Sequence, residues 1–251
     1  MPIEQIAIIV VLYILTLILP TCFWFLFFAY QDRKEPEPKS LIAYLFLWGI
    51  LTGFIAIIIN RLIEYYLFNS DINSAHQYLF EQDQNISARQ FITFLAVTSL
   101  FEEFVKLLAI LYFTYKNKYF TQIIDGVIYA TTIALGFSFF ENSIYFFEFS
   151  QYLSYKEFFI TSALRGIASV LLHLSATGII GYFIGLMKFK NKNKPLYLAI
   201  GLICGMLLHI FFNLFIQLKY PLNSISFTLL ALCFLLLFIS IQRKKALKIW
   251  N

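Results

Sequence analysis

Charged residues are scarce in this sequence, and their scarcity narrows the class of protein. Only 13% of the 251 residues are Asp, Glu, Lys or Arg, whereas 60% are hydrophobic and 20% are aromatic. Soluble globular domains are about half apolar, so this composition excludes a soluble domain. With ten glycines and six prolines, the chain also lacks a low-complexity segment. We expect one transmembrane domain over 1–251, without a soluble appendage.

Cysteine is equally scarce. Cys22, Cys204 and Cys233 are the only three, and each lies in an apolar segment. We expect them to be small core residues, since neither a disulfide framework nor a zinc site has this pattern. The net charge of +5 does not require a nucleic-acid partner, and the lipid bilayer is the expected surrounding.

Seven apolar segments are long enough to span a bilayer, which takes about 20 residues. The first is too long for a signal peptide and lacks a basic leader, so it is expected to remain as a span. Between the second and third spans, 61–90 is expected to be the longest loop. The fold class is therefore all-α and polytopic, with about seven transmembrane helices: 6–29, 41–60, 91–115, 122–147, 158–187, 195–217 and 224–242.

Basic residues are nearly absent from every second connection between these spans. One set of helix ends carries thirteen Lys and Arg residues and the other set carries four. The positive-inside rule assigns the basic set to the cytoplasm. The N-terminus is then outside and the C-terminus cytoplasmic. The four residues on the outer side are Arg61, Arg89, Lys156 and Lys219.

Three ionisable residues interrupt the third span, within "TFLAVTSLFEEFVKLLAILYF". A charge at the bilayer centre costs roughly 2.5–3.5 kcal/mol on insertion scales, so Glu102, Glu103 and Lys106 need partners or a cavity. Lys106 lies one helical turn from both glutamates and can pair with either. A structural ion pair accounts for one glutamate but not for two. A carboxyl group in such a setting suits general acid–base chemistry.

The next three spans contain further polar residues. At ~1.5 Å per residue from the outer helix ends, most of them lie at one level in the outer half of the bilayer, which suggests a shared cavity. His173 is counted deeper, and joins them only if its span begins outside the hydrocarbon. Arg165 balances charge or acts directly, and Asp125 lies near the cytoplasmic interface as a supporting residue. The polar residues on these spans are Glu141, Asn142, Arg165, His173, Thr177, His209 and Asn213.

Two chemistries suit carboxylates grouped with imidazoles. In one, a glutamate deprotonates a water molecule, and His209 with Asn213 stabilises the oxyanion formed on a peptide carbonyl. In the other, His173, His209 and a glutamate hold a metal ion that activates the water. The sequence has no G-x-S-x-G, no H-E-x-x-H and no Cys beside a His, so nucleophilic catalysis and the common zinc-helix motif are unsupported.

Four short motifs occur in order on four successive spans: "EEFVK", "FSFFEN", "HLSAT" and "HIFFN". Together they resemble the motifs of the PrsW family of intramembrane proteases, which is related to the CAAX-prenyl endopeptidase and bacteriocin-immunity superfamily. CAAX enzymes usually have His where Glu141 stands. The segments "DRKEPEPKSL" and "DGVIYATTIALGF" also resemble the family, so the resemblance extends from about residue 30 to 215.

The resemblance implies a role for each motif residue. Glu102 would be the general base with Glu103 as its alternative or partner, and Glu141 and His173 would complete the water-binding cluster beside His209 and Asn213. Lys106, Arg165, Asn142 and Asp125 would support them. It further implies metal-independent hydrolysis without a cofactor in a bacterial cytoplasmic membrane. The implied substrate is a single-pass membrane protein such as an anti-sigma factor, cut on the extracytoplasmic side.

Other interpretations remain open from the sequence. A non-catalytic scaffold of the same fold would use the polar residues to hold its helices together. A metal-dependent membrane protease would use the two histidines as ligands. A transporter would need polar residues along a pathway open to both sides, yet the cytoplasmic halves of the spans offer little besides Asp125. A fourth interpretation is an enzyme of the same fold that acts on prenylated peptides or lipid-like substrates, although Glu141 in place of the CAAX-type His argues against prenyl-peptide chemistry.

Overall fold

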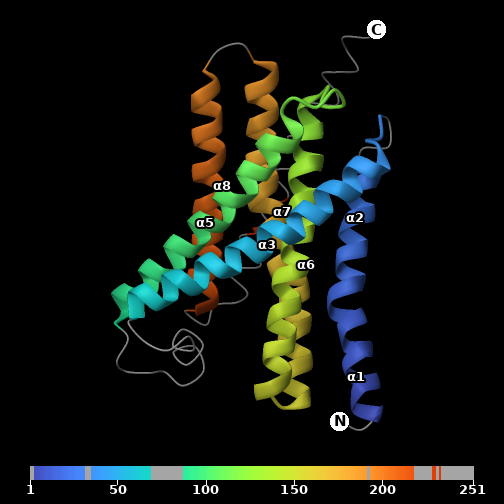
Figure 1. Ribbon diagram of the computed structural model, residues 1–251, viewed down its shortest axis with the longest axis vertical. Coiled ribbons are helices and arrows are strands. Elements are labelled where there is room, and N and C mark those ends of the chain that lie inside the picture. Colours follow the sequence, from blue (N-terminus) through green and yellow to red (C-terminus); the bar gives the residue numbers. More distant parts are fainter. Residues whose placement is uncertain are drawn as a thin grey trace.

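Every regular element in the described part of the chain is a helix (Figure 1). The structure is a computed structural model that describes residues 3–31, 35–68, 87–190 and 193–217, together with Thr228, Leu229 and Leu232. The first predicted span is one continuous rod of α1 (Ile3–Tyr13), the π-helical turn η1 (Ile14–Ile18) and α2 (Leu19–Gln31). The longer helices are α3 (Lys39–Phe68), α5 (Ala88–Thr114), α6 (Ile123–Tyr152), α7 (Tyr155–Phe189) and α8 (Lys194–Gln217).

Six of the seven predicted spans coincide with these helices, and the seventh, 224–242, lies almost entirely outside the described residues. By length and hydropathy, five of the helical segments described can cross a bilayer. α5 has the length, with 27 residues, but its centre holds Glu102, Glu103 and Lys106. Hydropathy alone therefore does not assign α5 to the membrane, and its partners must explain its position.

Serine residues determine where two of the site helices begin. Ser87 accepts the backbone N–H of Gln90, whose side chain returns the bond, so α5 starts with a capping box. Ser154 and Glu157 form the same arrangement at the start of α7. Only Leu153 and Ser154 separate α6 from α7, so the two helices form a tight antiparallel hairpin. Capping boxes satisfy N–H groups that a helix start leaves free.

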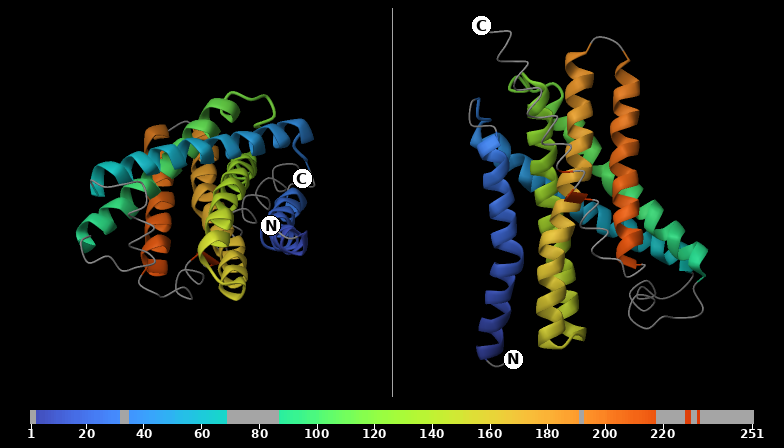
Figure 2. Two further views of the ribbon diagram at one scale, coloured as in Figure 1. Left: turned by 60° about the horizontal axis from the view of Figure 1, so that its bottom comes forward. Right: turned by 180° about the vertical axis from the view of Figure 1, so that it is seen from behind.

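The hairpin of α6 and α7 is the centre of the molecule, and the other helices surround it (Figure 2). α3 packs on α6, α8 packs on α7, and α5 joins α3 to α8, while the N-terminal rod contacts both central helices. α3 and α5 are strongly tilted against the rest (Figure 1). The tilt lets the C-terminal half of α3 pass beside α5 and reach the polar residues.

α3 and α6 touch at backbone level where two glycines face each other. A Cβ atom added to Gly49 would lie 2.2 Å from the carbonyl oxygen of Ile133, and one added to Gly136 would lie 2.1 Å from that of Phe46. Small residues let membrane helices approach this closely. The crossing point therefore sets the direction of α3 relative to the central hairpin.

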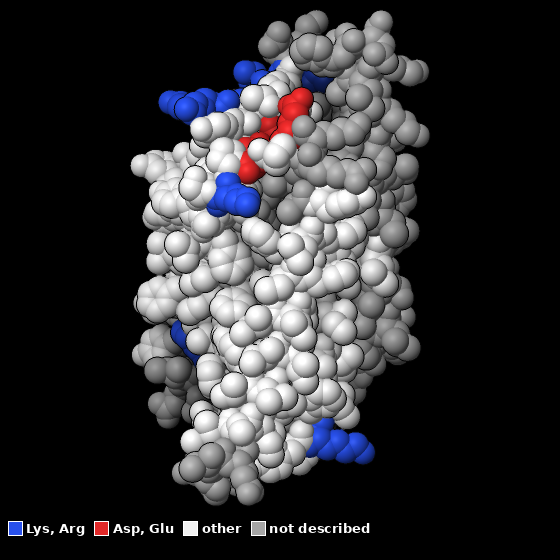
Figure 3. Space-filling view, turned by 90° about the vertical axis from the view of Figure 1, so that its right-hand side faces the viewer, with Lys and Arg blue, Asp and Glu red and all other residues white. Residues whose placement is uncertain are grey.

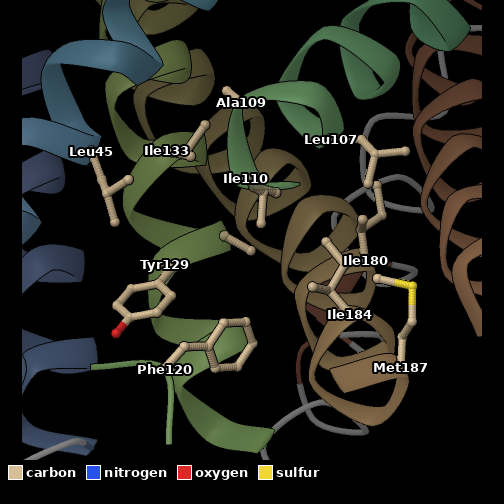
Figure 4. Packing of buried hydrophobic residues seen from close by; sticks show 11 residues of the cluster. Leu45, Leu107, Ala109, Ile110, Phe120, Tyr129, Ile133, Ile180, Ile184 and Met187 are labelled. Carbon is tan, nitrogen blue, oxygen red and sulfur yellow. The ribbon is translucent and has the colours of Figure 1, made fainter. Parts of the chain in front are cut away.

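A buried apolar core packs residues of α3, α5, α6 and α7 together (Figure 4). Its α5 members follow Lys106 and its α7 members follow Thr177, whereas its α6 members precede Phe137. All of them consequently lie on the basic, predicted cytoplasmic side of the polar residues. The members labelled in Figure 4 are Leu45, Leu107, Ala109, Ile110, Phe120, Tyr129, Ile133, Ile180, Ile184 and Met187.

The surface is consistent with a protein surrounded by lipid. On the face shown in Figure 3, uncharged residues cover the middle, and most Lys and Arg side chains gather toward one end. Large apolar side chains such as Phe23, Leu47 and Tyr112 are exposed along the helices. Cys22 and Cys204 are also exposed, so the prediction that they are core residues is wrong, and Cys233 lies outside the described residues. The lipid around the protein is as apolar as a protein core, so cysteine side chains are equally favourable at these exposed positions.

Two predicted boundaries are also corrected. α3 continues to Phe68, so the predicted loop 61–90 is helical at its start, and 69–86 lies outside the described residues. An ion pair between Arg61 and Glu64 on this extension, 3.1 Å apart, lets the helix continue past the apolar run. α7 has 35 residues, or ~52 Å at 1.5 Å per residue, which exceeds the ~30 Å hydrocarbon core. His173 therefore joins the other polar residues despite its distance from the helix start.

Candidate active site

Glu103 is buried, and both of its carboxylate oxygens are occupied. Oε1 accepts from Lys106 Nζ at 2.5 Å and from His209 Nδ1 at 2.9 Å, and Oε2 accepts from Thr177 Oγ1 at 2.9 Å. The side chains of Glu103 and Lys106 are both 0% exposed. With both oxygens engaged and the side chain fully buried, Glu103 is not accessible to a substrate. Glu103 therefore ties α5 to α7 and α8 and orients the ring of His209.

Glu102 has a different environment, because it faces a cavity. Its Oε1 accepts from Asn60 Nδ2 at 2.9 Å, whereas its Oε2 has no hydrogen-bond partner. Oε2 lies 3.6 Å from His209 Nε2. Since Glu103 takes the Nδ1 hydrogen of His209, Nε2 of the neutral ring is a bare acceptor. Two acceptors thus face each other, and a proton, a water molecule or a cation is needed between them.

Lys106 also fixes the ring of His173. Its Nζ lies 3.1 Å from His173 Nδ1, and because an ammonium can only donate, Nδ1 accepts. The ring hydrogen is then on Nε2, which donates to Glu141 Oε2 at 3.0 Å. Both nitrogens of His173 are therefore engaged. The His173 ring lies edge to face with that of His209, with centroids 5.2 Å apart.

Glu141 links this cluster to a basic residue on α7. Arg165 NH2 lies 3.3 Å from Glu141 Oε2, and Ser169 Oγ donates to the same oxygen at 3.3 Å. Arg165 Nε also donates to Asn142 Oδ1 at 3.2 Å, and its guanidinium stacks over Tyr145, 3.7 Å from the ring centroid. Arg165 thus fixes the position of the Glu141 carboxylate, and Asn142 in turn fixes the guanidinium of Arg165.

The structure brings all but one of the predicted site residues together. Asn213 lies one turn beyond His209 on α8, donates to Ser99 Oγ at 3.0 Å and lines the cavity. Asp125 lies apart from the cluster. It accepts the backbone N–H groups of Thr121 and Gln122, both at 2.7 Å, and so caps the start of α6.

The cavity has a volume of about 390 Å³ and is lined by α3, α5, α6, α7 and α8. Glu102, His173 and His209 form its inner end, and aromatic and aliphatic side chains line much of the rest. Toward the sparsely basic ends of the helices, Arg61 reaches Glu148 on α6 at 2.9 Å. The polar inner end and apolar wall suit a peptide segment drawn out of a membrane.

Two residues that line the cavity belong to none of the sequence motifs and were not predicted as site residues. Asn60 and Arg61 lie on α3, which carries no site motif, yet Asn60 contacts Glu102 directly. The available signal was a single amide in the otherwise apolar run "GFIAIIIN". Such a residue at membrane depth usually has a polar partner. The partner was not identifiable because the tilt of α3 is not encoded in any local pattern.

Three side chains offer donors of the kind that bind a catalytic metal. One ligand atom each from Glu102, His173 and His209 lies within 4.8 Å of the others. Two histidines and a glutamate are a known catalytic zinc set, and a carboxylate behind a ligand histidine, as Glu103 stands behind His209, is typical of such sites. Glu102 and His209 have bare donor atoms. His173 would have to exchange a hydrogen bond, to Glu141 or Lys106, for the ion. The types of ligand atoms present therefore suit a catalytic metal ion such as zinc.

The sequence of this chain is similar to those of one known protein family. The family model described as "PrsW family intramembrane metalloprotease" matches residues 37–241. Protease PrsW of Clostridioides difficile is 30% identical over 193 residues, covering 76% of this chain and 73% of that protein. Protease PrsW of Geobacillus kaustophilus is 27% identical over 183 residues (73% and 70%), and that of Bacillus subtilis is 22% identical over 184 residues (73% and 72%). No solved structure matches the chain. The chain therefore belongs to the PrsW family and is a multi-pass membrane protease.

Proposed function

We propose that this protease hydrolyses a peptide bond of a single-pass membrane protein near the outer leaflet, using water activated by Glu102. The observation that carries the proposal is Oε2 of Glu102, which is buried without a hydrogen-bond partner 3.6 Å from His209 Nε2, on a side chain that lines the cavity. A buried carboxylate oxygen with no donor lowers stability, and a catalytic role accounts for its presence. Glu103 is engaged at both oxygens and is not part of the cavity lining, so of these two neighbouring glutamates Glu102 is the one placed to act as the base.

The proposed steps use the side chains at the inner end of the cavity. Glu102 takes a proton from water, and the hydroxide adds to the peptide carbonyl carbon. In the resting site the proton between Glu102 Oε2 and His209 Nε2 is carried by His209. Asn213 and His209 Nε2 then both donate to the oxyanion, and Glu103 compensates the charge on His209 throughout. When the C–N bond breaks, Glu102 returns its proton to the leaving amine. Glu141, which lines the cavity and is oriented by His173, accepts a hydrogen bond from the water.

A second candidate is the metal-dependent version of the same reaction. It is supported by the three donors within 4.8 Å and by the description of the matching family model. Glu102, His173 and His209 would hold the ion, which when bound would acidify water and polarise the carbonyl. With the metal-independent mechanism, we expect purified protein to keep its activity after dialysis against a chelator, with no stoichiometric zinc by elemental analysis. Loss of activity that zinc restores would favour the metal-dependent version instead.

The substrate and location follow from the family resemblance. We propose an anti-sigma-factor-like protein as the substrate and the bacterial cytoplasmic membrane as the location. Cutting near the outer leaflet agrees with a cavity that extends toward the sparsely basic helix ends. Among the described residues, a buried apolar core lies between the polar cluster and the basic helix ends, which weighs against a transporter.

The experiment that tests the proposal compares the N-termini of membrane proteins in cells expressing wild type or Glu102→Gln at equal levels. We expect new termini just outside a single-pass span with wild type only. Glu157→Gln is the matched control, since Glu157 lies at the exposed start of α7, and it should behave as wild type. Identical N-termini with wild type and Glu102→Gln under several envelope stresses would contradict the proposal and favour a scaffold.

A further inference from the structure

Asn60 is the residue of α3 that touches the proposed base. Its Nδ2 lies 2.9 Å from Glu102 Oε1, and both residues line the cavity. Because a carboxylate can only accept, the amide nitrogen of Asn60 must face Glu102. This bond occupies Oε1 and leaves Oε2 toward His209. Asn60 thereby determines which oxygen of Glu102 is free.

The other end of the same amide has no hydrogen-bond partner. Asn60 Oδ1 is buried and accepts no hydrogen bond, as is true of Glu102 Oε2. Two contacting side chains that line the cavity, one from α3 and one from α5, therefore each carry a buried acceptor without a partner. Leaving buried acceptors unsatisfied costs roughly 1–3 kcal/mol each, so a donor from a bound molecule is the natural complement.

A substrate peptide supplies such a donor at the place where it is cut. The N–H groups of a transmembrane helix are bonded within the helix, but an unwound segment exposes them. In an apolar cavity these N–H groups need acceptors from the protein. Asn60 Oδ1 can accept a backbone N–H while Asn60 Nδ2 holds Glu102, so one side chain contacts both substrate and base.

We infer that Asn60 is both a positioning residue and a substrate-binding residue, an inference that rests on the proposed function. Its side-chain N–H orients Glu102. Its amide oxygen accepts one backbone N–H of the unwound substrate beside the cleaved bond. The ligand class is an extended peptide backbone, independent of side-chain identity. The two roles separate experimentally, since the first acts on the chemical step and the second on binding.

The first test measures kinetics with Asn60→Leu, which keeps the size of the side chain and removes both polar groups. The probe is a synthetic peptide containing the membrane span and cleaved bond found by the comparison of N-termini. We expect kcat to fall ~10-fold to ~100-fold, the loss expected for a bond to a charged group. Thr52→Val is the control, because Thr52 is a buried residue of α3 that bonds only within its helix, to Gly49 O. An unchanged kcat in Asn60→Leu would overturn the positioning role.

The second test identifies the substrate N–H. Each amide flanking the cleaved bond of the probe, but not the cleaved bond itself, is replaced in turn by an ester, which removes one N–H and weakens the adjoining carbonyl as an acceptor. In wild type we expect one ester to raise KM roughly 2-fold to 10-fold. In Asn60→Leu the same ester should have no effect, because its partner is already gone. If every ester has equal effects in both proteins, Asn60 is not the acceptor.

Folding failure and failure of the proposed function remain distinguishable from failure of this inference. Asn60→Ala is purified and assayed alongside Asn60→Leu. Both variants should match wild type in gel-filtration elution volume and in thermal unfolding temperature in detergent. If wild type produces no cleaved protein, the proposed function fails before Asn60 is tested. If wild type cleaves and Asn60 variants cleave equally well, only the inference fails.

Discussion

Glu102 and Glu103 are neighbours in the chain, but their surroundings predict different effects of substitution. Glu102→Gln retains the shape of a side chain with one free oxygen, so we expect turnover to fall ~100-fold to ~10,000-fold without a change in stability. Glu103→Gln removes the partner of buried Lys106 and should also lower the free energy of unfolding by about 3–5 kcal/mol. Unfolding in detergent with rising SDS, beside a cleavage assay, measures both effects. Equal stability losses would show that the two carboxylates have been assigned the wrong roles.

Lys106 provides a second prediction for the same buried pair. Besides Glu103 it contacts His173 Nδ1, and it lies 4.3 Å from the ring centroid of Phe137. Lys106→Met leaves the Glu103 charge unbalanced, so we expect about 3–5 kcal/mol of destabilisation. The double variant Glu103→Gln with Lys106→Met removes both charges. Its loss in free energy of unfolding should be smaller than the sum of the two single losses by ~1–3 kcal/mol, measured by the same unfolding assay. Additive losses would mean that the pair is not coupled.

Several site residues could be predicted from sequence because membrane burial makes polar residues conspicuous. The group of Glu102, Glu141, His209 and Asn213 at one depth follows from spacing alone, and the structure brings them to one cavity. The choice between Glu102 and Glu103 could not be predicted, since it depends on which face of α5 meets α8. Asn60 could not be predicted either, because no local pattern encodes the helix crossing that delivers it.

At the scale of the helices, the crossing of α3 and α6 offers a matched pair of substitutions. A Cβ at Gly49 would meet backbone atoms of α6 at 2.2 Å, whereas one at Gly53 meets the Phe140 side chain at 3.0 Å and the Phe137 carbonyl oxygen at 3.3 Å. Backbone cannot move aside as a side chain can, so Gly49→Ala must displace α3. We expect a destabilisation of roughly 1–3 kcal/mol or more and reduced turnover for Gly49→Ala, with clearly smaller effects for Gly53→Ala.

The same measurements, unfolding in SDS and cleavage of a synthetic substrate, apply to both glycine variants. Turnover is informative because displaced α3 carries Asn60 away from Glu102. If Gly53→Ala were the more damaging change, the crossing would not lie at Gly49.

Helix positions were largely predictable, whereas helix lengths and directions were not. Apolar runs marked α6 and α8 closely, but the polar extension of α3 to Phe68 and the overhang of α7 depend on ion pairs and capping. Runs of hydropathy report contact with lipid, not where a helix stops. The tilt of α3 and α5 results from packing and has no sequence period of its own.

For the whole molecule, the distribution of basic residues predicts its orientation in the membrane. In a variant with Cys22, Cys204 and Cys233 changed to Ser, a single Cys at Lys118 or at Lys156 can be labelled, as both positions are exposed. A membrane-impermeant maleimide added outside intact cells should label position 156 and not position 118. Opposite labelling would put the cavity on the cytoplasmic side and overturn the proposed outer cleavage.

The three charges in α5 have a consequence for how the protein is made. On leaving the ribosome, α5 precedes α7 and α8, which supply Thr177, His173 and His209 to its charged centre. Until then, its polar centre has only Asn60 of α3 and the pair within its own turn. Each charge opposes insertion by roughly 2.5–3.5 kcal/mol, so the translocon cannot release α5 alone as a finished span. Stable insertion of α5, the helix that carries the proposed base, therefore requires α7 and α8, which are synthesised later. Assembly of the active site and insertion of α5 into lipid are then coupled.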